Sequence, residues 1–303
     1  MNRITVGVVG LGSIALKAHL PVLVNHPGVE IVGLASRTGA RVADLTAQFR
    51  LALKARTFEE ILALKPAAAY LLSATEAHPD QAVALLNAGI AVYMEKPLAN
   101  DLDGARRIVE AAEGRFLMVG FNRRYAPAYR RAKELFGGRP PELIQITKHR
   151  SGDHSGWSVR QVVMDDTIHI IDLARFFAGE ATVAASICRT GLAAAQLATN
   201  SGAVVHLSQS YGAGAATERV ELHGGGLTVI VEEMEHLRIR EHGKERVEPL
   251  FGSWSTTLEK KGMAGATEHF LTCLRTGAQP DTTAAEAFRT QELAEAILTG
   301  GAG

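Results

Sequence analysis

The sequence predicts an α/β protein in which a doubly wound parallel sheet is followed by an α+β domain on a mostly antiparallel sheet. Up to about residue 121, short apolar runs alternate with amphipathic stretches, the pattern of a parallel sheet covered by helices. After Asn122, strand-like runs follow one another without intervening helices, which is typical of an antiparallel sheet. We therefore expect two domains, residues 1–121 and 122–303.

Each expected element of the first domain has a local signal. Strands are expected at residues 4–9, 30–35, 67–72, 91–94 and 116–119. Helices are expected at residues 14–24, 40–49, 79–88 and 102–113, with Asp101 as N-cap of the last helix and Gly89 as C-cap of the one before it. The carboxyl ends of such strands open on one crevice, where ligands bind.

The second domain opens with a basic helical segment, residues 125–136, that ends at Gly137-Gly138. Strands are expected at residues 143–149, 183–189, 195–199, 203–209, 217–222, 227–232 and 236–240. A longer segment that follows the first of these strands contains an expected helix at residues 162–177. Two further helices, residues 267–275 and 284–298, are expected to close the chain.

The chain begins with a glycine turn between an expected strand and an expected helix. Gly10-Leu11-Gly12-Ser13-Ile14-Ala15 has the spacing G-x-G-x-x-A. Gly10 permits the tight turn, Gly12 lets the backbone approach a pyrophosphate, and Ala15 lets the helix pack on the strand. The free N–H groups of the helix N-terminus would then face the phosphates. We therefore favour a dinucleotide site, with Gly10, Gly12, Ser13 and Ile14 in contact with it, over an ordinary glycine-rich turn.

Composition and charge narrow the functional classes. Apolar residues make up 47% and charged residues 21% of the 303 residues, as in ordinary globular proteins. Lys plus Arg and Asp plus Glu both number 32, so we expect neither a nucleic-acid partner nor a membrane partner. Cys188 and Cys273 match no metal-ligand spacing, and neither a signal peptide nor a membrane-spanning run is evident. A cytoplasmic location is expected.

The end of the second expected strand indicates which dinucleotide is bound. A carboxylate about 20 residues past the glycines would favour NAD, whereas this chain places Ser36-Arg37-Thr38 there. A guanidinium can pair a 2′-phosphate in a bidentate manner, and hydroxyl groups can donate hydrogen bonds to it. These residues favour NADP. NAD stays open as an alternative, as does a solvated Arg37 with no ligand.

Glu95-Lys96-Pro97 follows the expected strand 91–94, where side chains reach the nicotinamide end of the crevice. Pro97 keeps Lys96 out of helical geometry. An ammonium group beside a reacting hydroxyl would stabilise the developing alkoxide, and Glu95 would orient it. The alternative is an ordinary surface ion pair.

A third group of residues lies on the expected helix 162–177. Asp165 and His169 are four residues apart and share one face, with Asp172 three residues further on. The imidazole can accept a proton while a carboxylate holds its tautomer. Two alternatives are a solvated helix face and a divalent metal held by Asp165, His169 and His154. No recognised ligand spacing supports the metal, and we expect none.

Together these residues resemble the glucose-fructose oxidoreductase, inositol dehydrogenase and MocA (Gfo/Idh/MocA) family. The resemblance covers nearly the whole chain through these motifs: Gly10-Leu11-Gly12, His19-Leu20-Pro21, Thr75 to His78, Glu95-Lys96-Pro97-Leu98, Val119 to Arg124, and Asp165-x-x-x-His169-x-x-Asp172. It implies an N-terminal Rossmann domain, a C-terminal open-faced sheet, tightly held NAD or NADP, and hydride exchange with a sugar, cyclitol or related secondary alcohol. It also implies a catalytic set of Lys96, Asp165 and His169, and cofactor contacts from Thr75, His78, Glu95, Lys96 and Asn122.

The chain departs from many members before Asp165, where Arg160-Gln161-Val162-Val163-Met164 replaces a glycine-rich stretch. With Lys148-His149-Arg150 upstream, this variant resembles the MviM-like branch of the family. The candidate substrate residues are Lys148, Arg150, Arg160 and Asp172. The basic residues favour an acidic or phosphorylated ligand such as a uronate or a nucleotide sugar; the alternative is a set of strand-edge charges in solvent.

The leading hypothesis is an NADP-preferring dehydrogenase or reductase of a sugar-like secondary alcohol or ketone. Hydride would pass between the carbinol carbon and C4 of the nicotinamide while His169 accepts the hydroxyl proton and Lys96 stabilises the oxyanion. The alternatives are a glycosidase-type enzyme that uses transient oxidation by bound NAD, and a non-catalytic nucleotide-binding regulator. An exposed sheet face in the second domain predicts a homodimer or homotetramer.

Overall fold

The structure is a computed structural model that describes residues 3–152 and 156–300. It divides the chain into two compact units, residues 1–121 with 266–288, and residues 122–265 with 289–303. Residues 266–288, expected in the second domain, therefore group with the first unit. The reason lies in contacts between residues far apart in the sequence: Thr282 exchanges two hydrogen bonds of 2.7 and 2.8 Å with the main chain of Val119, and Phe270 packs its ring on Tyr70 and Tyr93.

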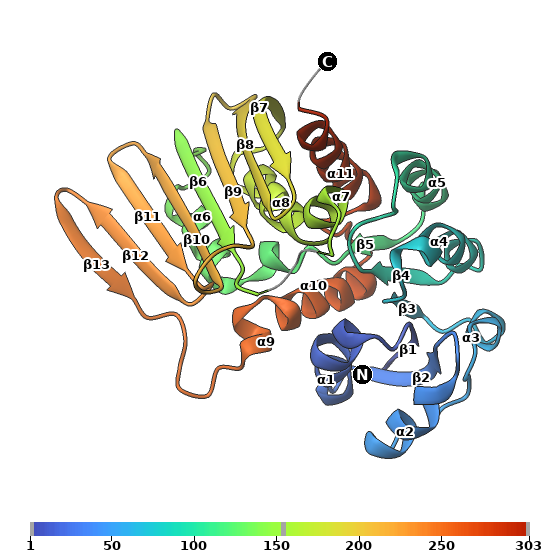
Figure 1. The fold of residues 1–303 in the computed structure, drawn as a ribbon. Helices are drawn as coiled ribbons and strands as arrows, with labels where there is room; N and C mark the ends of the chain where they lie inside the picture. The colour runs from blue at the N-terminus through green and yellow to red at the C-terminus, as the bar shows by residue number, and fades with distance from the viewer. Residues whose placement is uncertain (1–2, 153–155, 301–303) are drawn as a thin grey trace. The chain divides into compact units, whose positions relative to one another are not determined.

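The first unit contains a parallel sheet of five strands in the order β2-β1-β3-β4-β5 (Figure 1). Its strands are β1 (Ile4–Val9), β2 (Val29–Ala35), β3 (Ala68–Leu71), β4 (Ala91–Met94) and β5 (Leu117–Val119). All five expected strands are confirmed, with small differences at their ends. They are almost entirely buried, as strands of a parallel sheet between helices are.

Helices of the first unit follow the expected pattern. They are α1 (Leu20–Asn25), preceded by the π-helical turn η1 (Ala15–His19), then α2 (Ala40–Gln48), α3 (Phe58–Leu64), α4 (His78–Asn87), α5 (Leu102–Ala112) and most of α10 (Met263–Thr276). Asp101 accepts a 2.7 Å hydrogen bond from the Gly104 N–H, which confirms it as the N-cap of α5. Helix α3 was not expected, although Thr57 and Glu60 carry the spacing of a capping box and Thr57 caps the helix.

The second unit contains a sheet of eight strands in the order β13-β12-β11-β10-β6-β9-β8-β7. The strands are β6 (Leu143–His149), β7 (Ala181–Arg189), β8 (Leu192–Thr199), β9 (Val204–Ser210), β10 (Thr217–Gly224), β11 (Leu227–Glu232), β12 (His236–Glu241) and β13 (Lys244–Glu248). Strands β6 and β9 run parallel, and the other neighbouring pairs are antiparallel. Strand β13 was missed; the positive φ angles of His242 and Gly243 form the tight turn that leads into it.

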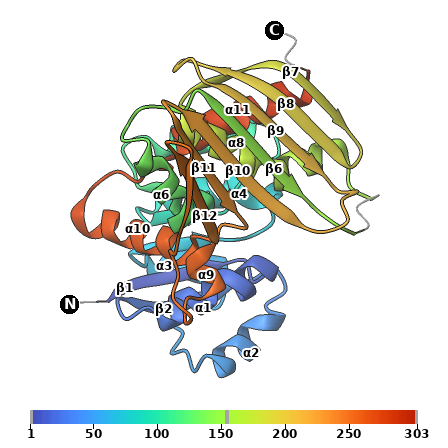
Figure 2. The same ribbon diagram turned by 90° about the vertical axis from the view of Figure 1, so that its left-hand side faces the viewer.

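The helical segments of the second unit are η3 (Asn122–Tyr125), α6 (Pro127–Leu135), α7 (Val159–Gln161), the π-helical turn η4 (Val162–Thr167), α8 (Ile168–Ala178), α9 (Thr257–Lys260) and α11 (Ala284–Leu298), which begins in the first unit. Of these, α6 and α8 lie on one face of the second sheet (Figure 2). Helix α6 packs on β11 and β12, and α8 packs on β6, β7 and β9. In the described part of the chain, no helix has the length and hydrophobicity needed to cross a bilayer.

Candidate active site

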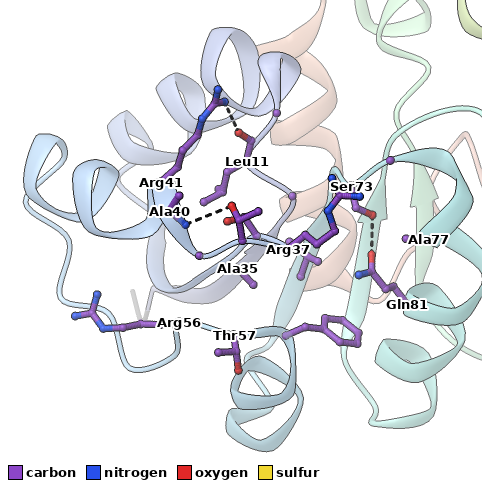
Figure 3. Close-up of a pocket in the computed structure, with 18 of the residues that line it drawn as sticks. Leu11, Ala35, Arg37, Ala40, Arg41, Arg56, Thr57, Ser73, Ala77 and Gln81 are labelled. Carbon is purple, nitrogen blue, oxygen red and sulfur yellow. Dashed lines mark hydrogen bonds between the residues drawn. The ribbon is translucent and has the colours of Figure 1, made fainter.

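A pocket of about 1070 Å³ lies at the carboxyl ends of β1, β2 and β3 (Figure 3). The glycine turn after β1 forms one wall. Gly10 has a φ of +95°, and a Cβ there would lie 2.4 Å from main-chain atoms of Leu72 and Ser73. A Cβ on Gly12 would meet no atom within 4 Å, so the turn leaves open space beside it. The turn is therefore shaped as a dinucleotide-binding turn requires.

Two observations on the pocket wall fit a phosphate-bearing ligand. A helix begins at Ser13 and Ile14, directly after Gly12. The first N–H groups of a helix have no acceptor within the helix, so they can bind a phosphate. The Ser36 hydroxyl lines the pocket, and its buried oxygen has no hydrogen-bond partner among residues 3–152 and 156–300. A buried hydroxyl in this state needs a ligand or water. The pocket therefore fits the adenosine and pyrophosphate parts of a dinucleotide.

Three arginines and two carboxylates, Glu59 and Glu76, contribute to the lining of the pocket. Arg37 and Thr38 line it, as expected for a 2′-phosphate site, and Arg41 and Arg56 line it as well. Arg41 Nη1 donates a 2.9 Å hydrogen bond to the Leu11 carbonyl of the glycine turn (Figure 3). No side chain caps the N-terminus of α2, which begins beside these arginines. Arg41 was not predicted, although it lies four residues after Arg37 on the first turn of the expected helix 40–49.

Glu95 and Lys96 follow β4 at the same carboxyl edge of the sheet. The Glu95 N–H donates a 3.0 Å hydrogen bond to the Leu71 carbonyl at the end of β3, which fixes the start of the segment. The carboxylate oxygen Oε1 of Glu95 lies 2.8 Å from His19 Nε2. Burial alone would raise the pKa of Glu95, but the hydrogen bond and charge of His19, with the charge of Lys96, hold it below the ordinary value. Glu95 is therefore an anion beside Lys96.

His78 holds two neighbouring strand ends together. Its ring is buried, with Nδ1 3.0 Å from the Pro97 carbonyl and Nε2 3.2 Å from the Ser73 carbonyl. Burial lowers the pKa of His78, so the ring is neutral at physiological pH. Thr75 opens the 3-10 turn η2 (Thr75–Ala77) next to this ring. The expected contacts of Thr75 and His78 with the cofactor stay predictions, and the observed role of His78 is to anchor the segment that contains Lys96.

Asp165 and His169 lie in the second unit, on η4 and α8. Asp165 is exposed and His169 is half-buried, whereas every other residue from Val162 to Ile170 is buried. Residues Val162–Thr167 form a π-helical turn, and the Thr167 hydroxyl donates a 3.0 Å hydrogen bond to the Val162 carbonyl within it. The two proposed acid–base residues are thus the accessible side chains of an otherwise buried segment.

Asp166, the neighbour of Asp165, is the centre of a buried polar cluster that the sequence analysis did not assign. Its carboxylate accepts hydrogen bonds from four side chains: Lys148, Arg150, Gln209 and Tyr211. Burial alone would raise the pKa of Asp166, but the hydrogen bonds and positive charges of Arg150 and Lys148 hold it well below the ordinary value. Burial, together with the charge of Arg123, lowers the pKa of Lys148 to about 7.

The structure places the four predicted substrate residues in ion pairs. Asp172 is 1% exposed, and both of its oxygens accept hydrogen bonds from Arg124, at 2.6 and 2.8 Å. Arg160 pairs with Glu295, while Lys148 and Arg150 pair with Asp166. Lys148 is 2% exposed, so it is not a strand-edge charge in solvent either. These pairs give Lys148 and Asp172 structural roles and leave Arg150, with 42% of its side chain exposed, as the cation of the cluster that faces solvent.

Two further predicted positions are Asn122 and His154. Asn122 opens the second unit, and its Nδ2 donates a 2.7 Å hydrogen bond to the Lys261 carbonyl. His154, named in the metal alternative, lies outside the described residues. Among the residues that are described, no three His, Cys, Asp or Glu side chains gather in a way that could hold a metal ion.

Comparisons with known proteins agree with this architecture. The profile of an oxidoreductase family with an NAD-binding Rossmann fold matches residues 4–123, and a YceM-like C-terminal domain matches residues 127–242. A putative oxidoreductase, YceM, of Salmonella typhimurium is 32% identical over 98% of both chains. The chain belongs to the Gfo/Idh/MocA oxidoreductase family. Its first unit is accordingly an NAD-binding Rossmann domain.

Two further relatives extend the comparison within the Gfo/Idh/MocA family. Inositol 2-dehydrogenase 3 of Saccharopolyspora erythraea is 30% identical over 61% of this chain and 57% of its own length. The crystal structure of a dehydrogenase, MviM, from Clostridium difficile has a TM-score of 0.91 and 28% identity, covering 98% of this chain and 99% of its own. The resemblance that the motifs indicated, including its MviM-like branch, is confirmed.

Proposed function

We propose that this oxidoreductase prefers NADP and transfers hydride between its nicotinamide and a secondary alcohol or ketone of a sugar or cyclitol. The loop after β2 carries the cofactor preference, because Ser36, Arg37 and Thr38 stand where NAD enzymes place a carboxylate. Arg41 adds a second guanidinium to the same wall of the pocket. The carboxylates in the lining, Glu59 and Glu76, come from α3 and from the segment after β3, away from this loop.

In this proposal Lys96, Asp165 and His169 form the catalytic set. The oxidised or reduced nicotinamide supplies the hydride chemistry. Lys96 stabilises negative charge on the substrate oxygen, and His169 takes or returns the hydroxyl proton. Asp165, one turn before His169, holds the imidazole in the tautomer that can do so. The accessibility of Asp165 and His169 in a buried segment supports these roles.

The reaction is tested by following nicotinamide absorbance with purified protein, NADP⁺ or NAD⁺, and a panel of polyols. The panel contains myo-inositol, because relatives are named inositol 2-dehydrogenases, together with aldoses, uronates and nucleotide sugars. We expect net reduction of NADP⁺ with at least one neutral polyol. Cleavage of a glycoside without net NADPH formation would instead identify the enzyme as a glycosidase-type relative.

Arg37→Ala is expected to weaken NADP binding about ten- to a hundredfold, because a charge-assisted hydrogen bond contributes about 1.5–3 kcal/mol. NAD affinity should change little, since NAD has no 2′-phosphate. Calorimetric titration with both nucleotides measures this. Arg106→Ala is the matched control, because Arg106 lies on α5 in an exposed ion pair with Asp103. Tighter binding of NAD than NADP by the wild type, or equal losses for both nucleotides in Arg37→Ala, would contradict the assignment.

We also propose that two copies of the chain associate through the outer face of the second sheet. Strands β6 to β9 form a shallow hollow of about 390 Å³ there, lined by uncharged small side chains such as Ala185, Ala194 and Ser208. Ile187, near the end of β7, is 65% exposed. The other half of the same face, on β10 to β13, carries ion pairs such as Arg219–Glu232 and Arg238–Glu232. An uncharged surface beside a charged one indicates an interface.

Ile187→Glu is expected to convert the oligomer into monomers, because it places a charge in the proposed uncharged interface. Light scattering coupled to size exclusion measures the mass. Val247→Glu is the control: Val247 is 64% exposed at the opposite edge of the sheet, among charged residues. A monomeric wild type, or an unchanged mass for Ile187→Glu, would show that this face is not the interface.

A further inference from the structure

His19 lies at the point where the first helix meets the end of β4. It ends the π-helical turn η1, which follows the glycine turn of the nucleotide pocket. Its ring is 1% exposed and stands edge-on to Tyr70 and Tyr93, with centroid distances of 5.7 and 5.3 Å. These two tyrosines are themselves buried and stacked at 4.6 Å. The imidazole therefore has one fixed orientation.

That orientation directs His19 Nε2 at the Glu95 carboxylate, 2.8 Å from Oε1. The other oxygen, Oε2, accepts a 3.3 Å hydrogen bond from the Lys96 N–H. Gly120 leaves room for the carboxylate, because a Cβ there would lie 2.9 Å from the Tyr93 hydroxyl and 3.3 Å from Glu95 Oε1. The carboxylate is thus held from one side by a ring and from the other by the backbone of the lysine.

We propose that His19 is a positioning residue that, through Glu95, fixes the conformation and the electrostatic surroundings of Lys96. This rests on the proposed catalytic role of Lys96. Because His19 is on the helix that starts at the nucleotide pocket, the same contact joins the pocket wall to the lysine. His78, which contacts the Pro97 carbonyl and lies within the field of Glu95, holds the other side of the segment.

Removing the His19 ring leaves a half-buried carboxylate whose main remaining opposite charge is the Lys96 ammonium. Without His19, the negative charge of Glu95 acts mainly on Lys96, and a nearby negative charge favours the protonated form of an amine. In His19→Leu, the pH at which Lys96 becomes half-reactive should therefore rise by about one unit, which corresponds to about tenfold slower acylation at neutral pH. His19→Gln keeps an N–H donor at similar reach and should restore most of the wild-type profile.

The experiment is competitive labelling of the full chain with acetic anhydride from about pH 6 to 10, with modification of the Lys96 peptide quantified by mass spectrometry. His26→Leu is the matched control, because His26 Nε2 lies 2.9 Å from Glu268 Oε2 in the same unit but away from Lys96. We expect the pH profile of Lys96 labelling to shift in His19→Leu and to stay unchanged in His26→Leu. Glu95→Gln removes the carboxylate charge and should move the profile in the opposite direction, which keeps the test decisive if His19→Leu does not fold.

An unchanged Lys96 profile in folded His19→Leu, or equal shifts in His19→Leu and His19→Gln, would overturn the proposal. Circular dichroism establishes that each variant is folded. The labelling needs no substrate, so its outcome is independent of whether Lys96 acts in hydride transfer. Loss of the positioning role and loss of the proposed function are therefore separate results.

Discussion

Asp166→Ala is expected to lower the free energy of unfolding of the second unit by about 3–5 kcal/mol, the cost of breaking one side of a buried ion pair. The substitution leaves the Lys148 ammonium, 2% exposed, without its carboxylate, and leaves Gln209 and Tyr211 without their acceptor. Lys148→Met is expected to cost less, because Asp166 then keeps Arg150 as its charged partner. Combining the two substitutions should recover part of the loss, since the buried ammonium is removed as well.

Tryptophan fluorescence during denaturation by urea measures this effect. The chain has two tryptophans, Trp157 and Trp254, and both belong to the second unit, so their signal reports on that unit. Glu245→Ala is the control: its ion pair with Arg240 is exposed to solvent and should contribute little to the free energy of unfolding. Equal midpoints for Asp166→Ala and Glu245→Ala would show that the cluster does not stabilise the unit.

The pH dependence follows from the lowered pKa of Asp166. In the unfolded chain this carboxyl has a pKa of about 3.9, so near that pH the unfolded state binds more protons than the folded state. The contribution of the Asp166 carboxylate to the free energy of unfolding is present in full above that pH and is lost as the pH falls further. The difference in stability between wild type and Asp166→Ala should therefore narrow below about pH 4.

Elements with a strong local signal were predictable from the sequence. Strand β4 and helix α11 have the expected bounds: β4 is a short continuous apolar run that is buried on both faces, and α11 is a long run of helix-forming residues. The π-helical turns η1 and η4 were not predictable, since a turn of this kind depends on what the side chains meet in the folded chain. The placement of residues 266–288 with the first unit also depends on long-range contacts, such as those of Phe270.

In the candidate site, too, some features were predictable from the sequence and others depend on tertiary contacts. Short motifs in the sequence predicted the glycine turn, Arg37 and Lys96 as site residues, and the structure places the turn and Arg37 on the pocket wall and Lys96 two residues after β4. The partners of those residues could not, because His19 and Glu95 are 76 positions apart and Gln209 is 43 positions from Asp166. Asp172 was predicted as a substrate residue, and in the structure a bidentate pair with Arg124 occupies its carboxylate. The sequence does not reveal this pair, because Arg124 and Asp172 are 48 positions apart.

Lys96→Ala and His169→Ala are each expected to lower kcat by about a hundredfold or more while leaving NADP affinity within about twofold of the wild type. Both side chains are assigned to charge that develops in the transition state, so they contribute little to ground-state binding. Turnover of whichever polyol the wild type oxidises gives kcat, and calorimetry gives the nucleotide affinity. In His169→Ala the fall of kcat/KM at acidic pH should also disappear, because the proton acceptor responsible for it is gone.

Exposed residues of the same types supply the controls for these two variants. Lys244→Ala, on β13, and His236→Ala, on β12, should keep wild-type turnover, since both side chains lie on the far strands of the second sheet. A drop in kcat for Lys96→Ala with normal nucleotide binding would locate the lysine at the reacting atoms. Near-normal turnover of Lys96→Ala would assign stabilisation of the substrate oxygen to another residue, and near-normal turnover of His169→Ala would do the same for the proton transfer. The catalytic set would then have to be sought around the solvent-facing Arg150 of the Asp166 cluster.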